Sequence, residues 1–311
     1  MEVERAEDRI RPWIVTTPLE ASPIGGALAT RLHLKLENQQ HTGSFKARGA
    51  FNRLLALGAD ARAGGVIAAS TGNHGAAVAY AAGKLGLQAR IVVSEDADAG
   101  KVAAIKTLGG AVEVHGRDSA VAEGYARRLA GAEGVPYVSP YNDPLVVAGQ
   151  GTIGVELERQ LPRADAVFIA LGGGGLLAGV GTWLRTVWPG AALIGCSPAN
   201  SAVMIESIRR GEILDLPSLP TLSDGTAGGI EPGAITFGPC RELATDFVTV
   251  TEEEIRHAMR MLFETHRMVV EGAAGVALAG YLSQAERWRD RTVVIVVCGG
   301  NVSPAVFRSV R

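Results

Sequence analysis

The sequence predicts an α/β fold with two open, mostly parallel twisted sheets covered by helices. From about residue 65 onward, short β-branched runs alternate with longer Ala-rich helical stretches, which is typical of parallel sheets covered by helices. Three of the runs end in turns rich in glycine or hydroxyl groups, and turns at strand ends are where ligands bind in such sheets. The fold class therefore already suggests a crevice at one edge of a sheet.

The expected strands follow one another along the chain. They are GVIAAS (65–70), ARIVVS (89–94), AVEVHG (111–116), PYVSP (136–140), AVFIALG (166–172), ALIGCS (192–197), FVTV (247–250) and TVVIVVCG (292–299). Helical patterns lie between them at 74–86, 101–109, 176–188 and 251–268. The last of these opens with Thr251 and Glu254 at capping-box spacing. The irregular stretch 212–239, rich in Gly, Pro, Ser and Asp, is either a functional loop or a surface linker.

Composition narrows the class of partner. The 311 residues include 30 basic and 32 acidic side chains, with a formal net charge of -2, so no strong field would attract nucleic acid or an anionic membrane. We expect a small-molecule partner. The three cysteines form no CxxC pair, which argues against zinc or disulfides and favours a cytoplasmic location. The N-terminus is dense in charge, and no segment approaches the roughly 20 apolar residues of a membrane span.

The glycine turn in AVFIALGGGGLLAGVG is suited to an anion. Gly172 to Gly175 lead from a strand into a helix, so exposed backbone N–H groups and the positive helix end would favour a phosphate. The turn also fits the G-x-G-x-x-A fingerprint of dinucleotide sites, but no carboxylate precedes Glu206 to hold a ribose. A purely structural alternative is that the glycines let the helix pack closely on the strand.

Two further turns could meet the first in one crevice. Residues 70–74 (STGNH) place hydroxyl and amide groups at a helix start, where they could bind a carboxylate or simply cap the helix. Cys298 ends the last strand, where a lone cysteine is commonly a small buried hydrophobic residue. Ligands of open parallel sheets bind outside the strand C-terminal ends, so the three turns can share one ligand.

Five segments together carry a family resemblance. KLENQQHTGSFKARGA, ASTGNHGAAVAYAA, GGGGLLAGVG, EGAAGVALA and VVCGGN occur in this order over essentially the whole chain. In them the sequence resembles fold type II pyridoxal-phosphate enzymes, which are tryptophan synthase β-like, and within these the threonine/serine dehydratase and serine racemase group. The resemblance implies pyridoxal 5'-phosphate as the cofactor.

The resemblance assigns cofactor contacts residue by residue. It makes Lys46 the Schiff-base lysine, in agreement with the ease with which desolvation lowers a lysine pKa. A phosphate loop is implied at Gly172, Gly173, Gly174, Gly175 and Leu176. Asn73 would face the pyridine hydroxyl oxygen and Cys298 the ring nitrogen. A neutral partner such as cysteine would leave that nitrogen largely unprotonated, a weaker electron sink than an aspartate-paired pyridinium.

The resemblance also implies a substrate site. The loop that receives the substrate carboxylate would be Ser70, Thr71, Gly72, Asn73 and His74, and Gly225, Glu271 and Asn142 would line the cleft. The implied reaction is the elimination of water from a small β-hydroxy amino acid such as L-threonine or L-serine, with Lys46 removing the α-proton, to give a 2-oxo acid and ammonia.

Alternative functions remain at this stage. A serine racemase would use the same cofactor, but Thr71 stands where racemases of this group carry the catalytic serine, and its methyl group and stiff χ1 favour elimination. The segment TLSDGTAGGIEPGAITF also resembles the corresponding segment of hydroxyectoine-utilisation dehydratases, whose substrate would be a hydroxylated diamino acid derivative. Outside enzymes, a nucleotide-binding module could use the glycine turn without covalent chemistry.

Metal, domains and assembly complete the expectations. Metal-binding members carry acidic ligands where this chain has Ser197 and Val203, so no metal is expected. We expect a large pyridoxal-phosphate-binding domain from 1–64 and 143–311 and a small domain from 65–142, with the site between them. The resemblance further implies a homodimer.

Overall fold

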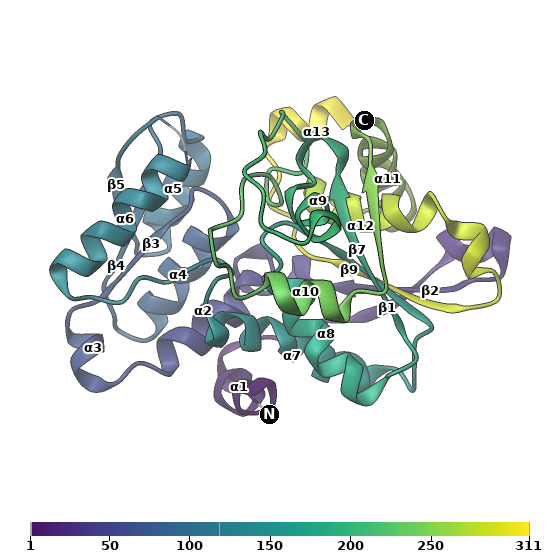
Figure 1. Cartoon of the computed structure of the whole chain (residues 1–311), viewed down its shortest axis with the longest axis horizontal. Helices are drawn as coiled ribbons and strands as arrows, with labels where there is room; N and C mark the ends of the chain where they lie inside the picture. Colours follow the sequence, from purple (N-terminus) through teal and green to yellow (C-terminus); the bar gives the residue numbers. More distant parts are fainter. Residues whose placement is uncertain (1, 118, 311) are drawn as a thin grey trace.

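Two open sheets covered by helices form the molecule, which confirms the predicted fold class (Figure 1). The computed structural model describes residues 2–117 and 119–310. A six-stranded sheet has the order β1-β2-β9-β6-β7-β8, and a three-stranded sheet has the order β3-β4-β5. The smaller sheet with its helices occupies the left of Figure 1, and the larger sheet lies on the right.

The larger sheet joins the two ends of the chain. Its strands are β1 (Leu19–Ser22), β2 (Arg31–Leu36), β6 (Ala166–Ala170), β7 (Ala192–Pro198), β8 (Asp246–Val250) and β9 (Thr292–Val297). All these strands run parallel to their neighbours except β1, which pairs antiparallel with β2. β6 and β9 are buried along their whole length, which explains their unbroken apolar sequences. The sequence analysis missed β1 and β2.

The smaller sheet is formed by β3 (Val66–Ala69), β4 (Ala89–Val93) and β5 (Ala111–Val114), all parallel. The strand predicted at 136–140 is wrong, because only Tyr137 forms an isolated bridge, to Ile67. Proline at both ends of this segment lacks the N–H that a longer ladder would need. The segment instead continues toward the crevice between the sheets.

Helices connect the strands and cover both sheets. They are α1 (Glu2–Ile10), α2 (Lys46–Leu55), α3 (Ala59–Ala63), α4 (Asn73–Lys84), α5 (Ala99–Thr107), α6 (Ser119–Glu133), α7 (Pro144–Gln160), α8 (Gly175–Val187), α9 (Val203–Arg210), α10 (Phe237–Leu243), α11 (Glu252–His266), α12 (Gly272–Leu282) and α13 (Pro304–Val310). The capping box predicted at the start of α11 is confirmed, with Thr251 and Glu254 each accepting from the other's backbone N–H. None of the helices in the described ranges is long and apolar enough to cross a membrane.

Helix α2 lies between the two sheets. It packs against α4, which covers the smaller sheet, and against α7, which belongs with the larger one. Ala47, Ala50 and Phe51 of α2 share a hydrophobic core with residues of β3 and β4. The predicted small domain covers 65–142, whereas α2 precedes it in the sequence and still contributes to the core beneath the smaller sheet. The predicted domain ranges therefore stay a prediction.

A fully buried cluster of charged residues holds α2 against β2 and α7. The Arg48 guanidinium donates to both carboxylate oxygens of Glu37 at 2.7 and 2.8 Å and to those of Glu156 at 2.9 Å each. Lys35 Nζ also donates to Glu156, at 2.6 Å. Burial opposes ionisation of Glu156, but Arg48 and Lys35 outweigh it and lower its pKa to about 2. The cluster joins the end of β2 to α7 through α2.

Candidate active site

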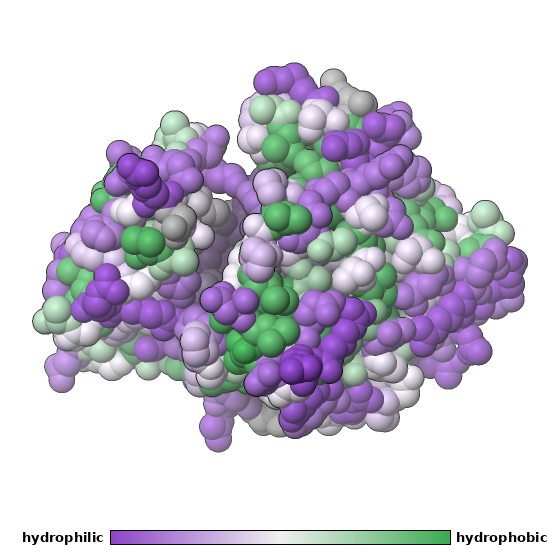
Figure 2. Space-filling model, turned by 45° about the horizontal axis from the view of Figure 1, so that its top comes forward, coloured by the Kyte–Doolittle hydropathy of each residue, from purple (hydrophilic) through white to green (hydrophobic). Residues whose placement is uncertain are grey.

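A cavity of about 730 Å³ lies between the sheets, in the size range of small-molecule sites. Figure 2 shows the surface hollowed between the two lobes. The predicted cofactor-binding and substrate-binding residues line this cavity. They are Lys46, Ser70, Thr71, Gly72, Asn73, His74, Gly172, Gly173, Gly174, Gly175, Leu176, Gly225, Glu271 and Cys298. Asn142, which was also expected to line the cleft, is not among the residues that line this cavity, but its side chain donates at 2.7 Å to Glu231, which does line it.

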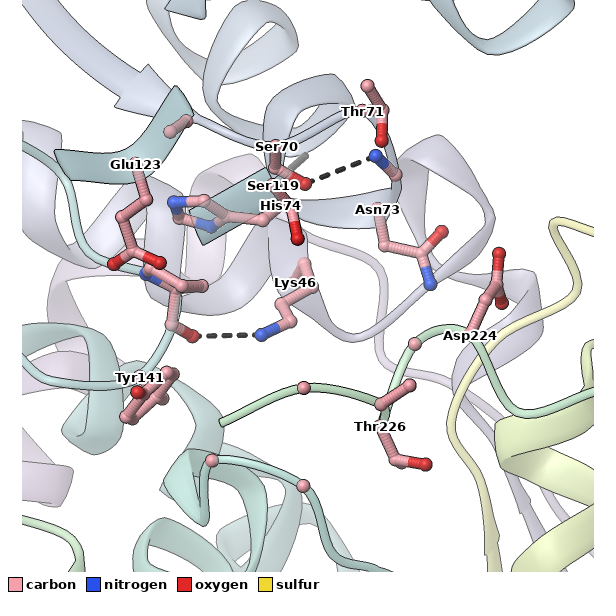
Figure 3. A pocket seen from close by; sticks show the side chains of 18 of the residues that line it. Lys46, Ser70, Thr71, Asn73, His74, Ser119, Glu123, Tyr141, Asp224 and Thr226 are labelled. Carbon is pink, nitrogen blue, oxygen red and sulfur yellow. Dashed lines mark hydrogen bonds between the residues drawn. The ribbon is translucent and has the colours of Figure 1, made fainter. Parts of the chain in front are cut away.

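Lys46 points into the middle of this cavity (Figure 3). The chain before it is tied to the end of β9, because Phe45 N–H donates to the Cys298 carbonyl at 3.1 Å. Lys46 Nζ donates to the Pro140 carbonyl at 2.8 Å. Burial lowers the pKa of Lys46 to about 8, although Cys298 and Glu271 act in the opposite direction. An appreciable fraction of the amine is therefore neutral, and able to act as a nucleophile or base, near pH 8.

The glycine turn forms the opposite wall at the N-terminus of α8. Gly174 has a φ of +86°, in the left-handed region, and a Cβ there would lie 2.6 Å from Cys240 Sγ. A Cβ on Gly172 would lie 2.9 Å from the backbone of Thr226. The first N–H groups of α8 have no partner within the helix, so this tight turn offers donors to an anion.

Asn73, Glu271 and Cys298 form a connected group on a third side. Asn73 Nδ2 donates to the two carboxylate oxygens of Glu271 at 3.0 and 2.8 Å. Burial raises the pKa of Glu271 to about 7, and the hydrogen bond from Asn73 opposes this. Cys298 Sγ lies 3.8 Å from Glu271 Oε1. The sequence analysis placed these residues near one another but gave no hint of their contacts.

The loop 70–74 enters α4 from β3. Gly72 N–H donates to Ser70 Oγ at 3.1 Å, which shapes the turn (Figure 3). His74 is buried, its Nε2 lies 2.8 Å from the Val138 carbonyl, and burial with the Lys46 charge lowers its pKa to about 3. The neutral imidazole therefore ties the start of α4 to Val138.

The structure adds a charged wall that the sequence analysis missed. Arg127 and Glu123 of α6 form an ion pair at 2.9 Å, and Arg127 also pairs with Glu231. Glu231 lies in the irregular stretch predicted at 212–239, which is irregular only over 212–236 because α10 begins at Phe237. Tyr141 Oη accepts from the Glu231 N–H at 2.9 Å. The only sequence signal for this wall was the unusual length of the irregular segment, because its α6 partners carry no motif.

No metal site is evident in this region. Ser197, at one position where acids were considered, is buried and donates to the Leu171 carbonyl at 2.6 Å, and Val203 lies in the hydrophobic core. Residues 2–117 and 119–310 contain no group of three or more His, Cys, Asp or Glu side chains that could hold a metal ion.

Comparison with known proteins identifies the family. Residues 10–299 match the family described as pyridoxal-phosphate dependent enzymes. The chain belongs to this family. It is 38% identical over 306 residues to the catabolic L-threonine dehydratase of Staphylococcus aureus, covering 97% of this chain and 88% of that protein.

Two solved structures of the pyridoxal-phosphate-dependent family resemble the whole fold. Threonine deaminase isoform 2 from Solanum lycopersicum, in its processed form, superposes with a TM-score of 0.93 at 33% identity, covering 99% of this chain and 92% of that one. Maize serine racemase superposes with a TM-score of 0.92 at 31% identity, covering 99% and 95%. Since both values are nearly equal, the fold does not separate elimination from racemisation.

The residues present fit pyridoxal phosphate. The glycine turn closes tightly enough to exclude any Cβ at Gly174 and leaves helix N–H donors for a phosphate. Lys46 supplies an amine whose pKa is lowered by burial, as attachment to an aldehyde requires. Asn73 and Cys298 supply polar groups on a third side of the cavity. The cavity thus offers this pyridoxal-phosphate-dependent enzyme one group for each polar part of its cofactor.

Proposed function

We propose that this enzyme is an ammonia-lyase that eliminates water from a small β-hydroxy amino acid such as L-threonine or L-serine, giving a 2-oxo acid and ammonia. One observation carries the proposal: Lys46, with its lowered pKa, shares a single cavity with the glycine turn and Asn73. The similarity to a threonine dehydratase over nearly the whole chain supports the same reaction.

Lys46 performs two tasks in this proposal. Its Nζ would hold the cofactor, and the same amine, once free, would remove the substrate α-proton. When bound, pyridoxal phosphate supplies an electron-withdrawing ring that acidifies this proton. Loss of the α-proton and the β-hydroxyl, together one water, leaves an enamine. A proton moves from its nitrogen to its β-carbon to give an imine, which one water then hydrolyses to the 2-oxo acid and ammonia.

Two walls of the cavity orient the substrate. The loop 70–74, at the start of α4, would receive the substrate carboxylate, because helix N-termini favour anions. Gly172 to Leu176 would hold the cofactor phosphate. With both anions fixed, the α-carbon is held within reach of Lys46, which lies centrally in Figure 3.

A second candidate substrate is a hydroxylated diamino acid derivative. Glu123 and Glu231 line the cavity and both pair with Arg127, so this wall carries two carboxyl groups for one guanidinium, and burial together with Glu123 raises the pKa of Glu231. A second ammonium group on the substrate would complement it. Racemisation is the remaining alternative, and Thr71 in place of serine disfavours it.

The test begins with the cofactor. After pyridoxal phosphate is added and the unbound cofactor is removed, the protein should keep visible absorbance from covalent attachment, and Lys46→Ala should abolish it. A panel of threonine, serine and a γ-amino β-hydroxy amino acid, scored separately for 2-oxo acid and for inverted amino acid, then identifies the reaction. Wild-type protein that keeps no visible absorbance after unbound pyridoxal phosphate has been removed contradicts the proposal.

We also propose a cytoplasmic homodimer. All three cysteines are buried free thiols, which suits a reducing compartment. Light scattering of the purified protein should give twice the mass of one chain.

A further inference from the structure

A threonine at the start of α10 holds the glycine turn, Gly172 to Gly175, from behind. Thr236 caps the N-terminus of α10, a position where a threonine hydroxyl commonly accepts from a backbone N–H of its own helix. Its Oγ1 instead donates to the Gly173 carbonyl at 2.7 Å, and the residue is buried. The hydroxyl therefore positions the turn rather than the helix that it begins.

A serine near the end of β7 holds the carbonyl that leads into the same turn. Ser197 is fully buried, and its Oγ donates to the Leu171 carbonyl at 2.6 Å. The glycine turn lines the cavity, whereas neither Ser197 nor Thr236 is among the described residues that do. Both hydroxyls therefore reach the turn from outside the cavity.

The direction of each carbonyl fixes the direction of the N–H that follows it. In a trans peptide group, the C=O of one residue and the N–H of the next point in opposite directions. With the Gly173 carbonyl directed to Thr236, the Gly174 N–H points away from Thr236. By the same geometry, the N–H that follows the Leu171 carbonyl points away from Ser197. In the part of the chain that the structure describes, neither N–H has a hydrogen-bond acceptor, so both are available to a ligand.

Contacts outside the turn hold Thr236 in place. Helix α10, which it begins, packs against α8 (Figure 1). Asn142 Oδ1 accepts from the Ile235 N–H at 3.0 Å, and Asn142 Nδ2 donates to Glu231. Tyr141 Oη accepts from the Glu231 N–H. The chain before Thr236 is thus tied to residues 141–142, and the hydroxyl has a fixed position from which to hold the Gly173 carbonyl.

We propose that Thr236 and Ser197 are positioning residues that direct backbone N–H groups of the glycine turn into the cavity, where these groups bind a phosphate. The inference rests on the placement of the cofactor phosphate proposed above. Without the Thr236 hydroxyl, the Gly173 carbonyl loses its donor, and a glycine-rich chain is free to rotate that peptide group. Rotation would turn the Gly174 N–H off the phosphate. Affinity for the phosphate should therefore fall, while attachment to Lys46 should not.

The test compares two ligands that differ only in the phosphate. Pyridoxal phosphate and pyridoxal carry the same ring and aldehyde, so Lys46 can attach to either one. In T236V, the Kd of pyridoxal phosphate should rise about tenfold, whereas the Kd of pyridoxal should stay within about twofold of the wild-type value. S197A should give the same pattern. Titrations followed by visible absorbance measure both constants.

Two outcomes overturn the proposal. Equal weakening of both ligands would mean that the variants merely loosen the fold, and unchanged binding of pyridoxal phosphate would mean that the turn does not need the hydroxyls. T236S keeps the hydroxyl and should bind both ligands like wild type, so a tenfold loss in T236S counts against the proposal. S197A decides the question if T236V fails to fold.

Matched controls separate this role from general stabilisation. Thr30 is also buried, and its Oγ1 donates to the Trp288 carbonyl at 3.0 Å, but it is not among the described residues that line the cavity. T30V should therefore lose stability as T236V does and still bind both ligands like wild type. Cys240 Sγ contacts the Gly174 carbonyl at 3.5 Å, but the Ala178 N–H already donates to that oxygen at 2.9 Å. C240A should change the Kd of pyridoxal phosphate by less than about twofold.

The wild-type protein distinguishes failure of this inference from failure of the proposed function. If wild type binds neither ligand, the proposed function fails. If it binds pyridoxal phosphate no more tightly than pyridoxal, the glycine turn is not a phosphate site, and the role of Thr236 and Ser197 alone fails.

Discussion

At the scale of single residues, burial decides the chemistry of Lys46. Its pKa of about 8 reflects removal from water, which outweighs the opposing influence of Cys298 and Glu271. Only the neutral amine attacks an aldehyde, so the rate of covalent cofactor attachment should rise with pH and reach half its maximum near pH 8. Stopped-flow absorbance measures this rate. A half-maximum near the ordinary lysine value, above pH 10, would contradict the burial argument.

The raised pKa of Glu271 predicts how the stability of the folded protein depends on pH. Its pKa in the folded protein, about 7, lies above its usual value of 4.5, so the folded state binds more protons than the unfolded state between these pH values. Stability of the cofactor-free protein should therefore fall as pH rises through this window. Because E271Q lacks this penalty, its stability relative to wild type should increase by up to about 3 kcal/mol from pH 5 to pH 8. Urea unfolding at both pH values checks this, and a constant difference would refute it.

At the scale of elements, α2 is positioned by the charged cluster behind it. Arg48 pairs with Glu37 and Glu156, and all three are fully or almost fully buried. Arg48→Met would leave two buried carboxylates without this partner and should cost about 3–5 kcal/mol. The exposed pair of Arg209 with Glu206 offers a matched control, and Arg209→Met should cost less than about 1 kcal/mol. Similar losses of stability in the two variants would show that the buried cluster contributes no more than an exposed ion pair.

At the scale of the whole molecule, the segment 212–236 connects the two sheets across the cavity. Asp224 pairs with Lys101 of α5 at 2.5 Å, and Glu231 pairs with Arg127 of α6. These partly exposed pairs are individually weak and are screened by salt. Loss of both in D224N/E231Q should speed amide hydrogen exchange in 212–236 about threefold to tenfold, and high salt should do the same in wild type. Exchange measured by mass spectrometry tests this. Unchanged exchange in the variant would mean that packing alone holds the segment.

Local patterns determined most of the fold and the list of site residues. Short β-branched runs between Ala-rich helical stretches marked the strands from β3 onward, apart from the wrong one at 136–140. The capping box of α11 was visible as Thr251 and Glu254. β1 and β2 escaped because the expected strands were recognised as β-branched runs. β2 (RLHLKL) contains no β-branched residue, although its apolar and polar residues alternate. Lys46, Asn73, Gly172 to Gly175 and Cys298 were found because each lies in a recognisable motif.

Only the tertiary structure decided how these residues act on one another. Burial lowers the pKa of Lys46, and burial together with Glu271 raises the pKa of Cys298. Asn73 donates to Glu271, which lies 198 positions away along the chain. The charged wall of Glu123, Arg127 and Glu231 likewise joins a helix to a distant loop. A sequence specifies which groups are present, whereas desolvation and hydrogen-bond geometry arise only when distant segments pack together.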